Sequence, residues 1–368
     1  MKTKILLWHW GRRGGGPRYT LELARALLTN SKIEIALSIS LQCEIHNEFS
    51  EIGVSRFDVN TYNGLSSAVL RTAQLPLLRK DFWNFVEREK INLIVCTMSH
   101  LWDVPILIGK KKRPPFLLVL HDAMPHPGDD VLFRSLLLKK EITQADAVVT
   151  LSRHVQQQLC QEYLFPKELS WVIPHGIFPY IKLASQRNNK IVKILFFGRI
   201  LPYKGLDLLL DALILLKDKE LNLHVNIVGP GEMKKYTAKI EQLDFVSVDN
   251  RWIPEEEIAG IFSSVDVTIL PYREASQSGV IATSFAIGVP VIVTPTGGLT
   301  EQVDNRVNGL ITKSITSEAI ADSITEIVEN DSLRHKCSGG AKHTAENDLS
   351  WPKIAENFSE VFTSILRK

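Results

Sequence analysis

Short apolar runs alternate with amphipathic segments along the whole chain, and this alternation restricts the possible folds more than any other feature. In the first half the runs cover residues 5–10, 33–39, 54–59, 93–97, 116–121, 147–151 and 171–176, and in the second half 194–197, 225–228, 246–248, 267–270 and 291–293. Helical patterns lie between them, among them 18–28, 66–90, 131–144, 152–163 and a final segment at 351–366. Apolar strands separated by helices are typical of parallel sheets with helices on both faces. The sequence therefore predicts an α/β protein.

The length of the chain and one polar stretch indicate two domains. A chain of 368 residues is long enough for two domains that each bury a core. Residues 183–190 are polar and lack periodicity, as expected of a linker. We expect one Rossmann-like domain over residues 1–182, a second over 191–350 and a C-terminal helix over 351–368, with a ligand cleft between the two domains.

Charge, cysteine content and hydropathy exclude several classes of function. A formal net charge of +2 gives no electrostatic case for a nucleic-acid partner. Cys43, Cys96, Cys160 and Cys337 show no CxxC spacing, so they indicate neither a disulfide framework nor a zinc site, and we expect reduced thiols in a cytoplasmic protein. The longest apolar run, residues 280–293, is too short and too often interrupted to span a bilayer, so any membrane contact is expected to be peripheral.

Two cations mark the junction between the strand at residues 194–197 and the helix that follows it. Arg199 comes directly after Gly198, and Lys204 directly precedes Gly205, where an amphipathic helix begins. Strand ends of open α/β sheets bind ligands, and helix N-termini offer free N–H groups and partial positive charge. We therefore predict an anion site suited to a diphosphate. The alternative is that both cations are ordinary solvated loop residues.

Two further features stand at strand ends in the first half. A glycine loop follows the first strand and opens the first helix, so close backbone approach by a ligand is predicted at Gly15 and Gly16, although the spacing is not the dinucleotide fingerprint. His121 ends the fifth strand, and its two ring nitrogens can donate to and accept from a sugar hydroxyl or a phosphate. A flexible turn and a structural histidine are the alternatives.

Small and polar residues fill the stretch 271–280, between a strand and an apolar helix. Ser276, Gln277, Ser278 and Gly279 stand at the start of that helix, where small residues let backbone N–H groups reach a phosphate. Glu274 is a candidate acceptor of hydrogen bonds from sugar hydroxyls.

Two stretches of the first half are candidates for contact with an anionic membrane. Lys110-Lys-Lys-Arg113 is a compact cationic run, and residues 75–90 mix leucine and aromatic residues with Arg79 and Lys80. A solvated loop and an ordinary core helix are the simpler interpretation of the two stretches.

Together, several motifs resemble a known family. Gly198-Arg199 with Lys204-Gly205, the strand end at Pro271-Tyr272, Gly288-Val-Pro290, Gly297-Gly298 with Glu301, and the closing helix from Trp351 resemble the retaining GT-B glycosyltransferases of glycosyltransferase family 4. The resemblance extends over nearly the whole chain and is densest in the second half.

The resemblance implies a GT-B fold of two Rossmann-like domains, a nucleoside-diphosphate sugar bound mostly by the C-terminal domain, a glycan or lipid-linked acceptor bound mostly by the N-terminal one, and no metal or other cofactor. It implies that Arg199 and Lys204 hold the donor diphosphate and stabilise it as it leaves, and that His121 contacts the donor sugar. Donor contacts are implied for Gly15, Gly16, Gly198 and the 274–279 stretch, and the last helix is expected to cross back to the N-terminal domain.

The sequence departs from the family pattern at a pair of glutamates that normally stand at a fixed spacing near the donor. If Glu274 is the first, the second position is Ala282; counted back from the Gly288-Val-Pro290 turn, the pair falls on Ala275 and Thr283. In either register the second carboxylate, which would accept from two ribose hydroxyls, is absent. Thr283 offers one hydroxyl in its place.

We therefore expect a retaining, metal-independent, hexosyltransferase-like enzyme of polysaccharide or glycolipid synthesis, in the cytoplasm or peripheral at the inner face of the cytoplasmic membrane. One alternative is a nucleotide-sugar epimerase of the same fold. Another is an inactive GT-B-like nucleotide-binding protein, which the missing glutamate would explain. The sequence offers no carboxylate pair that suggests a glycosidase.

Overall fold

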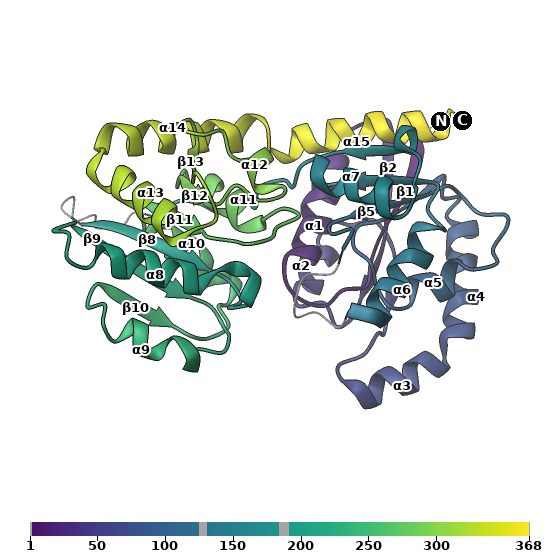
Figure 1. Cartoon of the computed structure of the whole chain (residues 1–368). Helices are drawn as coiled ribbons and strands as arrows, with labels where there is room; N and C mark the ends of the chain where they lie inside the picture. The colour runs from purple at the N-terminus through teal and green to yellow at the C-terminus, as the bar shows by residue number, and fades with distance from the viewer. Residues whose placement is uncertain (1, 125–130, 184–190, 368) are drawn as a thin grey trace. The chain divides into compact units, whose positions relative to one another are not determined.

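The computed structural model describes residues 2–124, 131–183 and 191–367, which form two compact units (Figure 1). The first unit comprises the described residues up to Gly176 together with those from Trp351 onward, and the second runs from Ile177 to Ser350. The first unit thus ends before the expected boundary at residue 182, and the C-terminal helix belongs to it. Most of the expected linker, residues 184–190, lies outside the described residues.

The first unit is built on a parallel sheet of seven strands in the order β3-β2-β1-β4-β5-β6-β7. Its strands are β1 Thr3–His9, β2 Ile33–Ser40, β3 Ser55–Val59, β4 Leu93–Cys96, β5 Phe116–Leu120, β6 Ala147–Thr150 and β7 Ser170–Val172. Its helices are α1 Gly15–Leu27, α2 His46–Ser50, α3 Leu65–Ala73, α4 Leu75–Arg88, α5 Asp103–Leu107, α6 Val131–Ile142, α7 Arg153–Glu162, the 3-10 turn η1 Lys167–Leu169 and α15 Trp351–Leu366.

The second unit is built on a six-stranded parallel sheet in the order β10-β9-β8-β11-β12-β13. Its strands are β8 Val192–Phe197, β9 Leu223–Val228, β10 Val246–Asp249, β11 Val267–Leu270, β12 Val291–Val293 and β13 Gly309–Ile311. Its helices are η2 Pro202–Lys204, α8 Leu206–Leu216, η3 Lys234–Tyr236, α9 Thr237–Ile240, α10 Glu255–Ser263, α11 Gly279–Ala286, α12 Leu299–Gln302, α13 Ser317–Glu329 and α14 Asp331–Asn347. The strand order reverses beside β1 and beside β8, and open α/β sheets generally bind ligands at the carboxyl ends of the strands at such a reversal.

Residue alternation along β1 explains how the first unit buries its sheet on both faces. Ile5 and Leu7 join the core formed with α1, α2 and α15, whereas Leu6 and Trp8 join the core formed with α4, α5 and α7. All four side chains are fully buried. The apolar run read from the sequence is therefore a central strand covered by helices on both sides.

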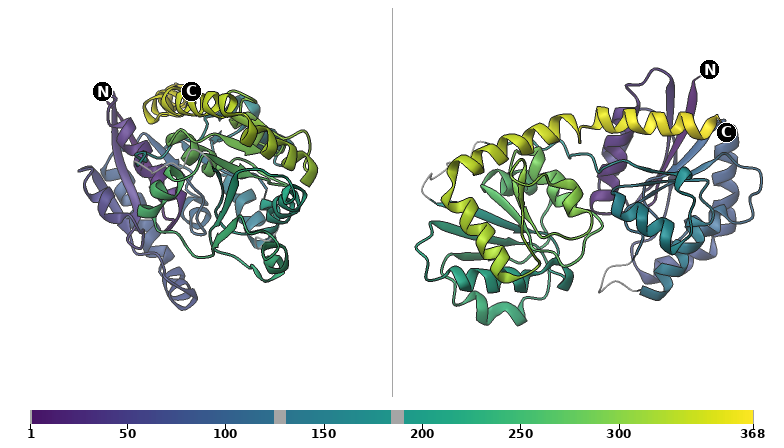
Figure 2. Two further views of the ribbon diagram at one scale, coloured as in Figure 1. Left: turned by 90° about the vertical axis from the view of Figure 1, so that its left-hand side faces the viewer. Right: turned by 45° about the horizontal axis from the view of Figure 1, so that its top comes forward.

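Helix α15 lies along α1 within the first unit, as the views in Figures 1 and 2 agree. Its apolar face, including Trp351 and Phe358, is part of the core shared with α1. The Trp351 ring meets the Tyr19 ring edge-on at 5.2 Å between centroids. A Cβ on Gly176 would come within 2.8 Å of Trp351, so the chain passes close to this ring where the first unit ends.

The prediction of an α/β protein with two parallel sheets is confirmed, and two details differ. Residues 66–90 form two helices rather than one, with the break at Gln74; Pro76 lies in the first turn of α4, where a missing N–H costs nothing. The strand β13 was not predicted, because three residues between polar segments give no detectable run.

Candidate functional site

Arg199 follows β8, and backbone hydrogen bonds hold the residues on both sides of it. The Gly198 N–H donates to Val228 O (2.9 Å) and the Ile200 N–H donates to Pro230 O (2.8 Å). The backbone on both sides of Arg199 is thus fixed to the loop after β9. Its side chain is exposed and forms no ion pair with the acidic residues that the structure describes.

Lys204 is buried at the end of η2, just before α8. Its Nζ donates to the Tyr272 hydroxyl at 3.0 Å and lies over the Tyr272 ring, 4.9 Å from the centroid. A Cβ on Gly198 would stand 2.9 Å from this Nζ, so the ammonium lies directly against the backbone of Gly198. Within the described parts of the chain, no carboxylate lies within ion-pair distance of Lys204. Lys204 is therefore a buried cation whose charge is balanced by no acidic side chain among those the structure describes.

The loop after β11 is fastened to the start of α8. Arg273 donates to both carboxylate oxygens of Asp207, at 2.7 and 2.6 Å, and the Arg273 N–H donates to Tyr203 O at 2.7 Å. The hydrogen bonds from Arg273 hold the pKa of Asp207 below its ordinary value. Gly205 (φ +68) packs against Pro271, whose carbonyl oxygen would be 1.9 Å from a Cβ. These contacts set the position of Tyr272 and, through it, of Lys204.

Residues 274–283 are placed less uniformly than the sequence suggested. Glu274 is exposed and lines a cavity of about 430 Å³ with Arg273 and Lys235. Ser276 is buried, and Gln277 Oε1 is buried without a hydrogen-bond partner among the described residues. Gln277 is thus a polar group available to a ligand.

Two of the expected hydrogen-bonding groups in this stretch are already used. The Ser278 N–H donates to Gln302 Oε1 (2.8 Å), although the sequence analysis expected backbone N–H groups of 276–279 to be free for a phosphate. The Thr283 hydroxyl donates to Gly279 O (3.0 Å), so it retains only its lone pairs for a ligand.

In the first unit, the glycine loop leads into α1. Gly15 is the first residue of α1, no side chain caps the helix, and its first turn contains no acidic residue. The Gly14 N–H donates to Glu44 Oε1 at 2.8 Å, so this amide is not free. A Cβ on Gly16 would be 2.7 Å from Met98 Sδ and 2.8 Å from His9 Cε1. The close approach at Gly16 was predicted for a ligand, but in the structure the atoms closest to this position belong to neighbouring side chains.

His121 stands just past β5 in an aromatic surrounding. Its Nε2–H donates to Thr97 O at 2.9 Å, which leaves Nδ1 as an acceptor. Its ring lies 5.5 Å from that of Tyr19 and 6.5 Å from that of His175. Burial lowers the pKa of His121, so the ring is neutral at pH 7. A neutral imidazole with a bare Nδ1 suits a hydroxyl donor such as a sugar.

His9, which the sequence analysis did not single out, lies beneath the glycine loop. Thr20 Oγ1 donates to Gly16 O (2.9 Å), Thr97 Oγ1 lies 2.6 Å from Thr20 Oγ1, and His9 Nδ1 lies 3.3 Å from Thr97 Oγ1. Thr97 Oγ1 also donates to Trp8 O at 3.4 Å, so these hydroxyls and the His9 ring form one hydrogen-bonded cluster in which either ring nitrogen can carry the proton.

The other ring nitrogen of His9 is Nε2. It is buried and has no hydrogen-bond partner among the described residues. Burial, with His100 and His121 nearby, lowers the pKa of His9 to about 3, so the ring stays neutral. The signal that would have found it is the alternation along β1, which places His9 on the same face as Ile5 and Leu7, toward α1.

One group of potential metal ligands occurs in the parts of the chain that the structure describes. Cys96, Asp103 and Glu141 are buried, with ligand atoms within 4.8 Å of one another. Burial raises the pKa of Asp103 and Cys96 above their ordinary values, and raises that of Glu141 to about 7. Cys96 Sγ donates to Asp103 Oδ2 (3.6 Å), as does the His100 N–H (2.5 Å). Protons held on these groups can balance the charge of the cluster.

Comparison with known families covers both halves of the chain. Residues 13–179 match the family described as Glycosyltransferase Family 4, and residues 181–344 match the one described as Glycosyl transferases group 1. The chain belongs to glycosyltransferase family 4. The resemblance to family 4 read from the sequence is thereby confirmed, whereas retention of configuration stays a prediction.

Individual proteins agree with this assignment. An uncharacterised glycosyltransferase of Methanocaldococcus jannaschii is 26% identical and covers 77% of this chain and 78% of its own. A D-inositol 3-phosphate glycosyltransferase of Jonesia denitrificans is 28% identical, covering 96% of this chain and 91% of its own. The crystal structure of Anabaena HepE in complex with UDP-glucose has a TM-score of 0.74 at 18% identity, covering 98% of this chain and 99% of that one. The fold of this glycosyltransferase is therefore GT-B.

None of the helices in the described ranges is both long and apolar enough to cross a bilayer.

Proposed function

We propose that this glycosyltransferase moves a sugar from a nucleoside-diphosphate sugar to an acceptor hydroxyl with retention of configuration, without a metal ion, in the synthesis of a polysaccharide or glycolipid. The diphosphate gains negative charge as its bond to the sugar breaks. Arg199 and Lys204 stabilise that charge, and they do so most strongly in the transition state.

The observation that carries the proposal is the buried ammonium of Lys204, whose one hydrogen-bond partner among the described residues is the Tyr272 hydroxyl. A buried cation without a counter-ion is unfavourable unless a ligand supplies the charge. Its place beside Gly198, at the strand end before α8, allows a phosphate to contact the ammonium near the positive end of the helix. A diphosphate meets all of these requirements.

The groups of the first unit suit the sugar and its acceptor. His121 accepts a hydrogen bond from a sugar hydroxyl at Nδ1, because its Nε2–H is committed to Thr97. The uncapped start of α1 at Gly15 and Gly16 offers N–H groups to the donor diphosphate.

Donor contacts in the second unit are proposed for Gly198, Glu274, Ser276, Gln277, Ser278, Gly279 and Thr283. Gln277 is the strongest candidate of these, since its Oε1 has no hydrogen-bond partner among the described residues. Anabaena HepE binds UDP-glucose, which makes UDP-sugars the first donors to test. The acceptor is proposed to be a glycan or a lipid-linked sugar, with peripheral contact to the inner face of the cytoplasmic membrane.

The test replaces Lys204 and Arg199 in the full chain. A donor is first identified by the rise in melting temperature that nucleoside diphosphates and their sugars cause. Lys204→Met and Arg199→Ala should each lower kcat on the order of a hundredfold to a thousandfold, as for other single groups that stabilise developing charge. Lys217→Met, at the far end of α8, is the matched control and should leave turnover unchanged.

Three readouts distinguish the rival functions. Normal turnover by both variants would show that the diphosphate lies elsewhere. Interconversion of the donor without an acceptor would indicate an epimerase, and binding of a nucleoside diphosphate without transfer or hydrolysis would indicate an inactive binding protein. The anomeric configuration of the product, read by NMR, tests retention, and activity that persists in EDTA tests independence from metal.

A further inference from the structure

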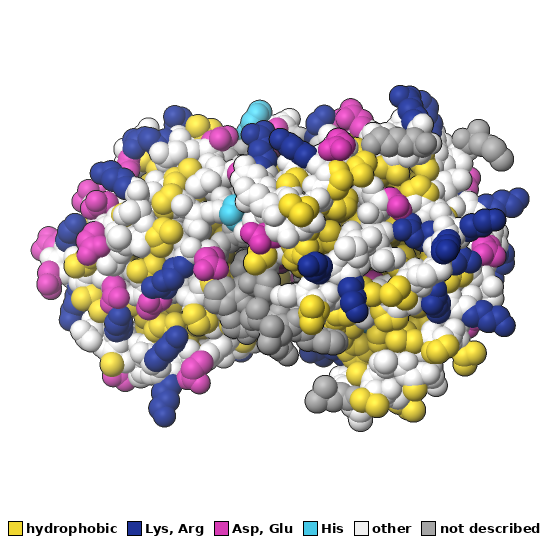
Figure 3. Space-filling model, turned by 45° about the vertical axis from the view of Figure 1, so that its right-hand side comes forward, with side chains coloured by type: hydrophobic (Ala, Val, Ile, Leu, Met, Phe, Trp, Pro, Cys, Tyr) yellow, Lys and Arg dark blue, Asp and Glu magenta, His cyan; other side chains and the backbone are white. Residues whose placement is uncertain are grey.

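Part of the first unit exposes large apolar side chains next to lysine and arginine side chains. Val69, Leu70 and Leu77, on α3 and the first turn of α4, are 75%, 63% and 67% exposed. Leu101 and Ile108, on either side of α5, are 45% and 49% exposed. We call this surface the α3–α4 face. Figure 3 shows hydrophobic side chains gathered beside Lys and Arg side chains in the right-hand part of the molecule.

Hydrogen bonds join the segments that form this face. Trp102 Nε1 donates to Thr72 Oγ1 at 3.2 Å, which ties the residues before α5 to α3. The Arg79 guanidinium donates to Ile108 O, which ties the residues after α5 to α4. Leu101 and Ile108 are thereby fixed next to the helices that carry Leu70 and Leu77. The exposed apolar residues are therefore carried by segments that are joined to one another.

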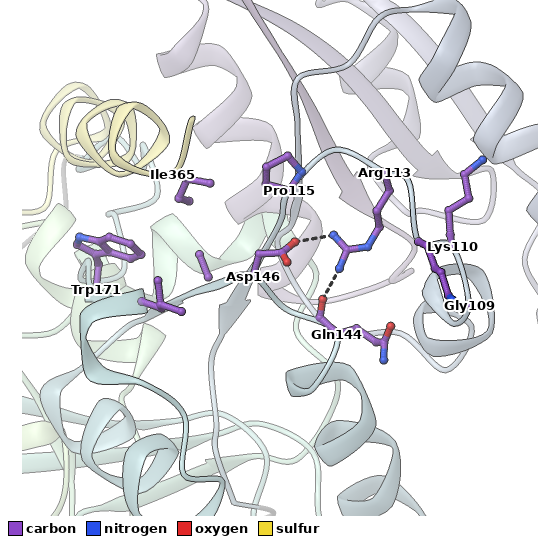
Figure 4. Close-up of a pocket in the computed structure, with 11 residues that line it drawn as sticks. Gly109, Lys110, Arg113, Pro115, Gln144, Asp146, Trp171 and Ile365 are labelled. Atoms are coloured by element: carbon purple, nitrogen blue, oxygen red, sulfur yellow. Dashed lines mark hydrogen bonds and ion pairs between the residues drawn. The ribbon is translucent and has the colours of Figure 1, made fainter. Parts of the chain in front are cut away.

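The cationic run 110–113 borders this face and divides into paired and unpaired members. Lys110 pairs with Glu87 (3.0 Å), and Arg113 donates to Asp146 (2.5 Å) and to Gln144 O (2.7 Å). Figure 4 shows Arg113 pointing at Asp146 and Gln144 beside a cavity of about 520 Å³, while Lys110 points away from them. Lys111 and Lys112 are exposed and have no ion-pair partner among the described residues.

The charge on the face has one sign in excess. Arg71, Arg79 and Lys80 on α3 and α4 add to Lys111 and Lys112, whereas the exposed acids in residues 66–88 and 101–113 are Asp81 and Glu87. Glu87 is already paired with Lys110. Apolar side chains flanked by cations are complementary to a bilayer of anionic lipids. The acyl chains of such a bilayer accept apolar side chains, and its phosphate headgroups attract cations.

We propose that the α3–α4 face docks on an anionic lipid bilayer, with Leu70 and Leu77 entering the acyl boundary and Lys111 and Lys112 contacting phosphate headgroups. This deepens the peripheral membrane contact of the proposed function, but it rests on exposure and charge and not on the transfer reaction. Burial of apolar side chains and attraction between opposite charges both favour binding to anionic lipids, and the α3–α4 face offers the two together.

The test is co-sedimentation of the full chain with vesicles, without donor or acceptor, so that it reports docking alone. Vesicles of phosphatidylcholine mixed with an equal part of phosphatidylglycerol should bind the chain, and vesicles of phosphatidylcholine alone should not. Raising the salt should weaken binding, because the headgroup contacts are exposed and screened. Lys111→Ala with Lys112→Ala should weaken binding roughly fivefold per charge.

A matched pair of apolar variants tests the other term. Leu70→Ser with Leu77→Ser should lower vesicle binding on the order of tenfold or more. Leu164→Ser, which is 84% exposed elsewhere in the same unit, should not change it. All variants alter exposed residues, and an unchanged melting temperature verifies that each is folded.

Three results would overturn the proposal. The first is equal binding to neutral and anionic vesicles, and the second is wild-type binding by both double variants. The third is self-association in light scattering that Leu70→Ser abolishes while vesicles are ignored, which would make the face an interface between copies of the chain. Turnover of a water-soluble acceptor by a variant that no longer sediments separates failure to dock from failure of the transferase assignment.

Discussion

Gly205 offers the sharpest test of how the structure holds the proposed diphosphate site. It has φ +68, and a Cβ would stand 1.9 Å from Pro271 O, which belongs to the backbone and is not free to swing away. Gly288, in the same unit, has φ +72, and the nearest atom to its Cβ is Lys342 Cβ at 3.6 Å, an ordinary contact. The pair Gly205→Ala and Gly288→Ala therefore shares the backbone strain and differs in the clash.

The expected magnitudes follow from these two terms. An alanine in the left-handed region costs about 1 to 2 kcal/mol, and this is the whole cost at Gly288. Relieving the contact with Pro271 requires a shift of the backbone, which adds about 1 to 3 kcal/mol, as overpacking does elsewhere. Gly205→Ala should thus lose roughly 2 to 5 kcal/mol and lower the melting temperature of the second unit by roughly 5 to 15 °C.

The clash should also reach the ligand site. Pro271 precedes Tyr272, whose hydroxyl accepts from Lys204 Nζ, so a displaced Pro271 moves the group that positions the ammonium. Differential scanning calorimetry measures the stability of both variants, and isothermal calorimetry measures their affinity for the nucleoside diphosphate found by screening. Equal melting temperatures of Gly205→Ala and Gly288→Ala, together with equal affinities for the nucleoside diphosphate, would contradict the close packing of α8 on the loop after β11.

Two further predictions concern buried charge. Burial raises the pKa of Glu141 from 4.5 to about 7. Between these two pH values the folded state binds a proton that the unfolded state has lost. The contribution of this group to the free energy of unfolding is therefore fully present below pH 4.5 and falls as the pH rises to about 7, by up to about 1.4 kcal/mol per pH unit. Glu141→Gln keeps a neutral side chain at every pH and should flatten that slope in chemical-denaturation curves, whereas an unchanged slope would assign it to other groups. Lys204→Met removes a buried ammonium that no carboxylate balances, so the ligand-free variant should melt at or above the wild-type temperature while losing the stabilisation that a nucleoside diphosphate gives the wild type. A lower melting temperature of the ligand-free variant would show that the contact with Tyr272 outweighs the cost of the buried charge.

The fold followed from the sequence wherever an element carried its own signal. Buried parallel strands such as 116–121 and 194–197 are continuous apolar runs, and their alternation with helices led to the two sheets. The short strand β13 has no such run, because its place at the sheet edge depends on pairing with β12 and not on its own residues. The split between α3 and α4 was missed because both helices continue one amphipathic pattern through Gln74.

The candidate site was readable in part for the same reason. Arg199 and Lys204 stand at a strand end in the sequence, so local reasoning found them. That Lys204 is buried against Tyr272 is a tertiary fact, because the two residues lie far apart in the chain. His9 looked like one more strand residue, and only the chain of hydroxyls through Thr97 and Thr20 shows which of its nitrogens lacks a partner.

The chemistry of the two units is divided in a way that fits the two halves of a nucleotide sugar. The second unit presents cations at its strand ends, Lys204 held in place by Tyr272 and Arg199 free to adjust, so part of the cost of ordering a diphosphate site is met before the ligand arrives. The first unit presents two neutral imidazoles, His9 and His121, and the Nε2–H of His121 donates to Thr97 O, which leaves its Nδ1 as an acceptor. An unprotonated ring nitrogen repels phosphate oxygens and accepts hydrogen bonds from hydroxyls. Specificity for a sugar is therefore expected to depend on the first unit as much as on the second.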